Sequence, residues 1–354
     1  MNFDLLAMLQ EAIRLNASDI FIVAGLPITF KVSGKNHFYS EEKTTALSAQ
    51  QLVEEICQLA GGRPPERMLA GDDDFSFALK GLSRFRVSTY RQRGSLAAVI
   101  RIITFDLPDP NQMGIPENVL RLGDFPKGMV LVTGPAGSGK STTLACMIDR
   151  INSSRSGHII TLEDPLEFLH SHKKSIVSQR EIPTDTLSYA TALRASLRQA
   201  PDVILLGEMR DYETINIAMT AAETGHLVIS TLHTIGAANT IDRIIDVFPP
   251  NQQRQIATQL ATVLQAVVSQ QLVPGVDGTL SPAFEVMIMT PAIRNMIREG
   301  KVHQIDSAIG TGANTDMIAM DTSLAQLLKA GSITAETALQ YAVNPELFQK
   351  RYLS

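Results

Sequence analysis

GPAGSGKS, residues 134–141, is the stretch that decides the fold. An apolar run, 129–132, precedes it and a helical pattern follows it, which is the context in which such a sequence binds phosphate. Closely spaced glycines let the backbone curl so that its N–H groups point at phosphate oxygens, and the N-terminus of the following helix adds positive potential. We therefore expect a nucleoside triphosphate site. A glycine-rich turn that only joins a strand to a helix is the structural alternative.

The side chains of this loop have separate expected tasks. Lys140 would reach the β- and γ-phosphates, and the hydroxyl of Ser141 would bind Mg²⁺. The backbone of the loop would hold the other phosphate oxygens. The loop residues expected to bind the nucleotide in this way are Gly134, Gly137, Ser138 and Gly139.

Composition narrows the class of protein. The chain has 354 residues, of which 44% are hydrophobic and 19% charged, and this suits two cored domains of a soluble protein. Its net charge of −5 argues against a nucleic-acid partner, because phosphate backbones are held by clustered Lys and Arg. The two cysteines, Cys57 and Cys146, are too few for a disulfide framework and indicate a reducing, cytoplasmic compartment. No apolar run reaches the roughly 18 residues of a membrane span, so we expect only peripheral membrane association.

The first part of the chain has helical spacing over residues 5–13 and then strand signals typical of partly buried antiparallel hairpins. TFDLPDPNQMGIP, 104–116, is rich in proline and suits neither helix nor strand. We therefore predict a domain at 1–106, a linker at 107–116 and a second domain at 117–354. The expected strands of the first domain lie at 20–23, 28–32, 75–79, 85–90 and 97–103.

Strand and helix signals alternate in the second domain, which predicts an α/β fold with a parallel sheet covered by helices on both faces. The remainder from Ala237 is expected to be mostly helical. One apolar stripe of that region would hold Ile256, Leu260, Val263, Leu264 and Val267. The expected strands are 129–133, 158–162, 203–206 and 226–231, and the expected helices are about 139–152, 186–199 and 212–223.

IITLEDPLE, 159–167, delivers two acids to the end of an apolar strand. Ligands of open α/β sheets bind at the carboxyl ends of the strands, so Glu163 and Asp164 would face the phosphates. Glu163 is the candidate to orient and deprotonate the attacking water. In the alternative interpretation these acids cap a helix that has Pro165 at its first position, which is physically sensible for Asp164.

DVILLGEMRD, 202–211, is a Walker B element with glutamate where many such proteins have aspartate. Its fully apolar part predicts a buried central strand, and Glu208 follows that strand after a glycine. The Glu208 carboxylate would act on Mg²⁺ through water, because Mg²⁺ usually keeps part of its hydration shell. Alone this signal is weak, but its position after the phosphate loop and Glu163 makes it specific.

Two histidines occur in TAAETGHLVISTLHT, 220–234. His226 starts a predicted strand and His233 follows the end of that strand. Both are candidates to report on the γ-phosphate by hydrogen bonding. A structural role is the alternative for each, since a lone histidine is more often a satisfied structural residue.

Four segments occur in the order GPAGSGKSTT, HIITLEDPLEF, PDVILLGEMRD and TAAETGHLVISTLHT, and they resemble the Walker A, Asp box, Walker B and His box of type II/IV secretion ATPases. Within that superfamily the chain most resembles the PilT family of type IV pilus retraction ATPases, over nearly its full length. The AIRNMIRE sequence is similar to the AIRNLIRE signature of retraction ATPases. Other matching segments are ASDIFIVAGLP at 17–27, DFSF at 74–77, RFRVSTY at 84–90, TIDRIIDVFP at 240–249 and PAIRNMIREGK at 291–301.

The resemblance implies a PAS-like N-terminal α+β domain and a RecA-like P-loop ATPase domain with a helical C-terminal part. It implies a homo-hexamer that couples ATP hydrolysis to pilin depolymerisation and twitching motility. The implied partners are an inner-membrane platform protein and other pilus machinery, at the inner face of the cytoplasmic membrane. Assembly ATPases usually have an extra N-terminal domain and a tetracysteine zinc motif. Neither is found in this sequence, which favours retraction.

Residue by residue, the resemblance assigns Thr142 to the nucleotide and metal beside Lys140 and Ser141. It also implies that arginines of the first domain approach the triphosphate. Arg84, Arg86 and Arg101 stand in the matching segments, and we take Arg86 and Arg101 as the catalytic candidates. Solvated charges on strand edges are the alternative for these arginines.

Two departures from the family pattern stand out. Phe21 occupies the place where the retraction family usually has histidine, a change that looks like the accessory PilU-like branch. Ala136 replaces the usual threonine of the phosphate loop, which should matter little because backbone N–H groups make the contacts there. The remaining alternatives are an assembly or secretion ATPase and a nucleotide-dependent interaction switch with little turnover. For a motor, we expect ATP binding to swing the first domain about a hinge at 104–116.

Overall fold

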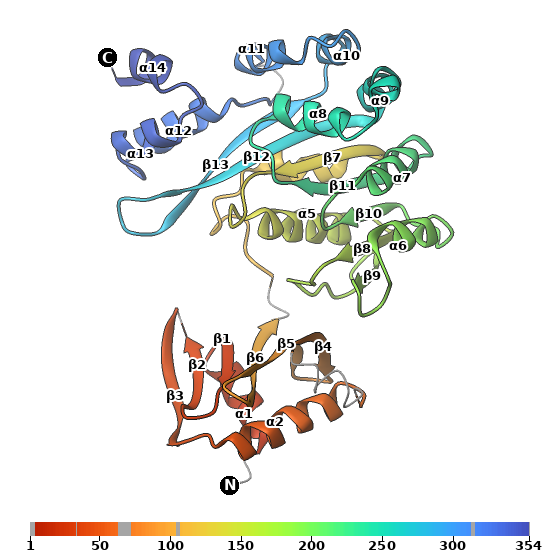
Figure 1. Ribbon diagram of the computed structural model, residues 1–354. Coiled ribbons are helices and arrows are strands. Elements are labelled where there is room, and N and C mark those ends of the chain that lie inside the picture. Colours follow the sequence, from red (N-terminus) through yellow and green to blue (C-terminus); the bar gives the residue numbers. More distant parts are fainter. Residues whose placement is uncertain (1–3, 33, 63–71, 104–106, 313–315, 354) are drawn as a thin grey trace. The chain divides into compact units, whose positions relative to one another are not determined.

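The computed structural model of the chain describes residues 4–32, 34–62, 72–103, 107–312 and 316–353 (Figure 1). Contacts divide the chain into a first unit, residues 1–106 with 167–169, and a second unit, residues 107–166 with 170–354. Residues 104–106 of the expected hinge lie outside the described part. Residues 107–116, the expected linker, count with the second unit, where Ile115 is buried and the Pro108 carbonyl accepts a hydrogen bond from Cys146 Sγ at 3.3 Å.

An antiparallel sheet with the strand order β3-β2-β1-β6-β5-β4 organises the described part of the first unit. Residues alternate between buried and half-exposed along β5, as expected for a sheet covered on one face. Helices α1 and α2 cover that face with apolar side chains such as Leu9 and Ile56. The elements are α1 (Leu5–Arg14), β1 (Ala17–Ile22), β2 (Pro27–Val32), β3 (Lys35–Lys43), α2 (Ala46–Leu59), β4 (Asp73–Leu79), β5 (Ser83–Gln92) and β6 (Ser95–Ile103).

The second unit is built on a sheet with the strand order β13-β12-β7-β11-β10-β8-β9. All neighbours pair in parallel except β12 and β13, which are antiparallel. Its strands are β7 (Gly128–Thr133), β8 (His158–Glu163), β9 (Ile176–Glu181), β10 (Val203–Leu206), β11 (Leu227–Leu232), β12 (Leu264–Pro274) and β13 (Leu280–Ile288).

Helices cover both faces of this sheet, as the alternating pattern predicts, so the α/β fold class is confirmed. On one face, α5 packs Met147 and Ile151 against β7, β8 and β11. On the other face, α6 to α11 enclose a second core around Leu131 and Leu206. The helices are α4 (Glu117–Leu120), α5 (Lys140–Ser154), α6 (Tyr189–Ser196), α7 (Tyr212–Glu223), α8 (Ala237–Asp246), α9 (Pro250–Val263), α10 (Pro291–Arg298) and α11 (Ile305–Thr311), with 3₁₀ turns η1 (Arg121–Asp124) and η2 (Val302–Gln304).

The prediction of a mostly helical region after Ala237 is wrong for residues 264–288. Helix α9 ends at Val263, and Leu264 begins the long β12–β13 hairpin, visible in Figure 1 as a projecting ribbon. The expected helical stripe therefore does not include Leu264 or Val267. Strand β12 is buried on both faces along most of its length, and the mostly apolar residues at its start have no periodicity that separates a strand from a buried helix.

The last helices pack against the outer part of this hairpin. Their small core joins Val273 of β12 and Ala283 of β13 to Leu324 and Phe348. No helix among the described residues is both long and apolar enough to cross a membrane. The C-terminal elements are α12 (Met320–Lys329), α13 (Ala335–Tyr341), α14 (Pro345–Phe348) and the π-helical turn η4 (Gln349–Leu353).

Candidate nucleotide site

The phosphate loop joins the end of β7 to the start of α5. Gly134, Gly137 and Gly139 have φ values of 143°, 76° and 85°, which L side chains rarely adopt. The glycines of the GPAGSGKS sequence therefore serve the backbone conformation of this turn. Helix α5 begins directly after it, at Lys140, so the helix N-terminus faces the loop.

The Lys140 side chain lies inside the curve of the loop. Its Nζ atom donates hydrogen bonds to the carbonyl oxygens of Gly134 at 2.9 Å and Pro135 at 2.8 Å. The residue is buried, with an exposed fraction of 8%. The ammonium group is thus held beside the loop backbone, where a phosphate group would bind.

The three hydroxyl residues of this segment differ in their surroundings. Ser138 is buried, its Oγ has no hydrogen-bond partner within the described residues, and its backbone N–H donates to the Pro135 carbonyl at 3.2 Å. Ser141 and Thr142 are half-buried in the first turn of α5. Their position next to the loop agrees with hydroxyl groups that bind a nucleotide or its metal ion.

Parallel pairing brings the second and third candidate acids to the same edge of the sheet. Glu163 is the last residue of β8, and Glu208 follows β10, the strand next to β8. Gln179 Nε2 of β9 donates to Glu163 Oε1 at 3.4 Å. Glu208 has an exposed side-chain fraction of 12%, and its Oε2 accepts an ion pair from Arg210 Nε at 2.6 Å.

His233 also reaches this edge. It follows β11, which lies between β7 and β10, and its Nε2 is 3.3 Å from Glu208 Oε2. The backbone N–H of Gly134 donates to the carbonyl of Leu232 at 3.3 Å, so the start of the phosphate loop touches the end of β11. The loop, Glu208 and His233 therefore form one continuous constellation.

His226 does not join this constellation within the chain. It precedes β11, and Leu227 pairs with Gly128 at the start of β7, whereas the loop follows the other end of β7. Six residues of strand separate the two ends, about 20 Å at roughly 3.3 Å per residue. The His226 Nδ1 atom lies 2.9 Å from the Ala221 carbonyl at the end of α7, a structural contact.

The helix-cap alternative for Asp164 is not seen. Residues 164–170 contain no helix, and Asp164 is exposed next to Glu163. The sequence reasoning missed Tyr189, which begins α6. A Cβ placed on Gly207 would lie 2.7 Å from the Tyr189 hydroxyl, so this ring packs on the turn before Glu208. Burial, and then the nearby carboxylates of Glu208, Asp164 and Glu163, raise the pKa of Tyr189 well above its usual range.

The two candidate arginines lie in the first unit, on the sheet face opposite to α1 and α2. Arg86 of β5 and Arg101 of β6 are directly opposite each other in the antiparallel ladder, so both side chains share that face. Arg101 Nε donates to Asp19 Oδ1 at 2.9 Å, although the Arg101 side chain is 65% exposed. The third candidate, Arg84, is two residues from Arg86 and lies on the same face.

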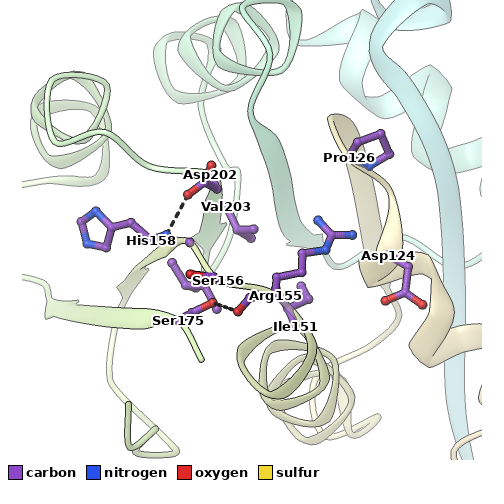
Figure 2. Close-up of a pocket in the computed structure, with 11 residues that line it drawn as sticks. Asp124, Pro126, Ile151, Arg155, Ser156, His158, Ser175, Asp202 and Val203 are labelled. Atoms are coloured by element: carbon purple, nitrogen blue, oxygen red, sulfur yellow. Dashed lines mark hydrogen bonds between the residues drawn. The ribbon is translucent and has the colours of Figure 1, made fainter. Parts of the chain in front are cut away.

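Two cavities in the second unit help to delimit the site. One, of about 440 Å³, adjoins Glu208, Arg210 and His233 and extends toward Arg243 of α8. Figure 2 shows the other, of about 390 Å³, at the opposite edge of the sheet. There the Asp202 carboxylate accepts from the His158 backbone N–H at 2.8 Å. This second cavity lies at the amino ends of β8 and β10, away from the phosphate loop.

Comparison with known proteins supports the assignment of a nucleotide site to the phosphate loop and its neighbouring acids. The family described as Type II/IV secretion system protein matches residues 2–336. The chain is 44% identical to the type IV pilus retraction ATPase PilT of Pseudomonas aeruginosa, covering 98% of this chain and 100% of that protein. It is 39% identical to the type IV pilus ATPase PilU of the same organism, covering 95% and 87%.

A solved structure shows the same fold. The crystal structure of the pilus retraction motor PilT with bound ADP has a TM-score of 0.90 and 43% sequence identity, and the match covers 99% of this chain and 100% of that one. The chain therefore belongs to the type II/IV secretion system protein family, and it is a nucleotide-binding ATPase of the group that includes the pilus retraction ATPases.

Proposed function

We propose that this chain is the subunit of a hexameric motor that hydrolyses ATP to retract type IV pili and so powers twitching motility. The observation that carries this proposal is the convergence of the phosphate loop, Glu163, Glu208 and His233 at one edge of the sheet. Phosphoryl transfer needs little more from a protein than a phosphate cradle, charge stabilisation and a group that positions the attacking water.

Each group at this edge has a distinct task in the proposed reaction. Backbone N–H groups of the phosphate loop and the Lys140 ammonium bind the phosphates. Glu163 orients the attacking water and accepts its proton. Glu208 and Ser141 hold the metal, and His233 contacts Glu208 on the side of the γ-phosphate.

The residues present fit Mg²⁺. Within the described residues there is no group of three or more His, Cys, Asp or Glu side chains suited to hold a metal ion. Mg²⁺ does not need one, because it keeps several waters and is bound through one or two carboxylates and the substrate phosphates. A Ser141 hydroxyl and the mostly buried Glu208 carboxylate supply such a set. When bound, Mg²⁺ neutralises the charge that develops on the phosphates.

Arg86 and Arg101 complete the site from a neighbouring subunit in this proposal. Their shared, solvent-facing position on the sheet of the first unit leaves Arg101 largely exposed. An arginine that stabilises transition-state charge is worth roughly 10³ to 10⁵ in kcat. ATP binding then draws the first unit of one subunit toward the second unit of the next, with residues 104–116 as the hinge.

Retraction is the favoured role because PilT matches over the whole chain at higher identity than PilU does. Phe21 is the observation that favours a PilU-like accessory role as the second candidate, since the sequence departs from the retraction pattern there. Either role implies the pilus machinery and its inner-membrane platform protein as partners. It also implies peripheral association with the inner face of the cytoplasmic membrane.

Mixing of two inactive variants tests the shared site. Lys140→Ala removes the phosphate ligand, and Arg101→Ala removes the arginine, so each homogeneous ring should lose ATPase activity. A mixed ring contains junctions that join an intact phosphate loop to an intact arginine, and we expect activity to peak near equal amounts of the two. Lys140→Ala mixed with Glu163→Gln is the matched control, because both groups belong to one chain and no junction recovers. Absence of recovery in the first mixture would refute a site completed by Arg101 of a neighbour.

A further inference from the structure

Strand β12 lies directly beside β7 and extends past the start of the phosphate loop. Ser269 of β12 pairs with Thr133, the last residue of β7, so Gln270 stands level with the first residue of the loop. Gln270 is 2% exposed and lies next to the loop rather than in it. A long polar side chain that is nearly fully buried needs a partner, and the Gln270 side chain has one in Thr143 of α5.

The backbone of the loop rests on Gln270 at both of its ends. A Cβ atom placed on Gly134 would lie 2.2 Å from the Gln270 carbonyl oxygen, and one placed on Gly139 would lie 2.8 Å from Gln270 Nε2. Carbon atoms do not approach oxygen or nitrogen so closely without a bond. The backbone of β12 therefore excludes a Cβ at Gly134, and at Gly139 the end of the Gln270 side chain occupies the space that a Cβ would take.

The side chain of Gln270 also holds the helix that follows the loop. Thr143 Oγ1 donates a hydrogen bond to Gln270 Oε1 at 2.7 Å, and Thr143 is fully buried. With Oε1 committed to Thr143, Nε2 lies on the side of Gly139. One amide group thus contacts both the loop and the first turn of α5.

We propose that Gln270 is a positioning residue of the nucleotide site. It does not contact the phosphates itself. It fixes the start of α5 relative to the two ends of the loop, so that the backbone N–H groups and Lys140 converge before the nucleotide arrives. The inference rests on the proposed nucleotide site and adds to it a residue from a strand more than a hundred residues away in the sequence.

Gln270→Leu tests this role because leucine keeps most of the volume and removes both polar atoms. We expect the Kd of the full-length protein for ADP, measured by isothermal titration calorimetry, to rise about tenfold, the equivalent of one lost hydrogen bond. The neighbouring Gln271 is the matched control, since it lies in the same strand, pairs with Ala283 of β13, and faces away from the loop. Gln271→Leu should change the Kd by less than about twofold.

Thr143→Val gives a second route to the same contact, and it serves if Gln270→Leu does not fold. We expect Thr143→Val to weaken ADP binding. The double variant should bind ADP little worse than Gln270→Leu alone, because both changes remove the same hydrogen bond. Thermal unfolding without nucleotide distinguishes the positioning role from a purely structural one. A purely structural role would lower the melting temperature and leave the Kd of the folded protein for ADP unchanged.

These experiments distinguish an error in the role of Gln270 from an error in the proposed nucleotide site. Loss of ADP binding in Lys140→Ala with an unchanged Kd in Gln270→Leu and Thr143→Val would overturn only the role of Gln270. An equal rise in Kd for Gln271→Leu would also overturn it, because the effect would then belong to the strand as a whole. Unchanged ADP binding in Lys140→Ala would instead refute the site itself.

Discussion

The imidazole of His233 lies 3.3 Å from the carboxylate of Glu208, and the two residues follow the neighbouring strands β11 and β10. Glu208 also receives Arg210 Nε at 2.6 Å on the same oxygen, Oε2. A carboxylate that is only 12% exposed and held by two nitrogen groups has few rotamers open to it. These two contacts therefore fix the orientation of the Glu208 carboxylate before any ligand binds.

His233→Ala and His226→Ala should behave differently. Loss of the His233 contact with Glu208 should lower kcat about tenfold, the cost of a hydrogen bond to a charged group. His226 instead contacts the Ala221 carbonyl at the opposite end of β11, so its loss should lower the melting temperature and leave the Kd for ADP unchanged. Steady-state ATPase assays measure kcat, ADP titration measures the Kd, and thermal unfolding measures the melting temperature of both variants. Weaker ADP binding in His226→Ala would contradict the assignment.

Glu163→Gln should separate nucleotide binding from turnover. Glutamine keeps the shape of the side chain and its acceptor for Gln179, but it does not accept a proton. We expect kcat to fall by roughly 10² to 10⁴ with ADP affinity retained. Steady-state ATPase assays measure kcat, and isothermal titration calorimetry with ADP measures the affinity.

Glu208→Gln should change the metal requirement. The weaker amide ligand should raise the Mg²⁺ concentration needed for half-maximal activity on the order of tenfold or more. Titration of ATPase activity with Mg²⁺ at saturating ATP measures the shift, and Glu213→Gln, an exposed change in α7, is the control. Equal Mg²⁺ dependence in wild type and Glu208→Gln would remove Glu208 from the metal site.

Gly134→Ala and Gly137→Ala form an informative pair in the phosphate loop. At Gly134 an added Cβ would meet the Gln270 carbonyl oxygen at 2.2 Å, whereas at Gly137 nothing lies within 4 Å and only the positive φ of 76° opposes alanine. We expect the first change to abolish ADP binding and the second to weaken it less, by about fivefold, because a strained φ costs on the order of 1 kcal/mol. Comparable losses in both variants would show that steric contact with β12 is not decisive.

Stability should fall in acid partly because of His170. Burial lowers the pKa of His170 to about 4, so the folded protein keeps this ring neutral while the unfolded chain binds a proton below about 6.5. The unfolded state therefore gains stability as the pH falls from about 6.5 to about 4. His170→Phe should reduce the loss of melting temperature over that interval, compared with wild type and with His303→Gln at an exposed position. A parallel pH profile for all three proteins would contradict this account.

The phosphate loop, Glu163 and Glu208 were predictable because each follows an apolar strand, and parallel strands bring their carboxyl ends to one edge. The same rule, applied to His226, would have placed it at the other edge, since it precedes its strand. The resemblance to a known family supplied the two candidate arginines, but no local pattern distinguishes them from solvated charges on a strand.

The contribution of β12 was not predictable from local patterns. Residues 264–268 are mostly apolar and fit a buried helix as well as a central strand, and only the pairing with β7 decides between them. Gln270 contacts Thr143 across 127 residues of sequence, and Tyr189 reaches Gly207 from the start of another helix. Such contacts depend on the tertiary arrangement, which periodicity does not contain.

The most direct test of the central proposal is Mg²⁺-dependent ATP hydrolysis measured as a function of protein concentration, with Glu163→Gln as the control. A motor whose sites are completed between subunits should show a specific activity that rises with concentration and vanishes in Glu163→Gln. Tight ATP binding without turnover at any concentration would contradict the motor and indicate a nucleotide-dependent switch.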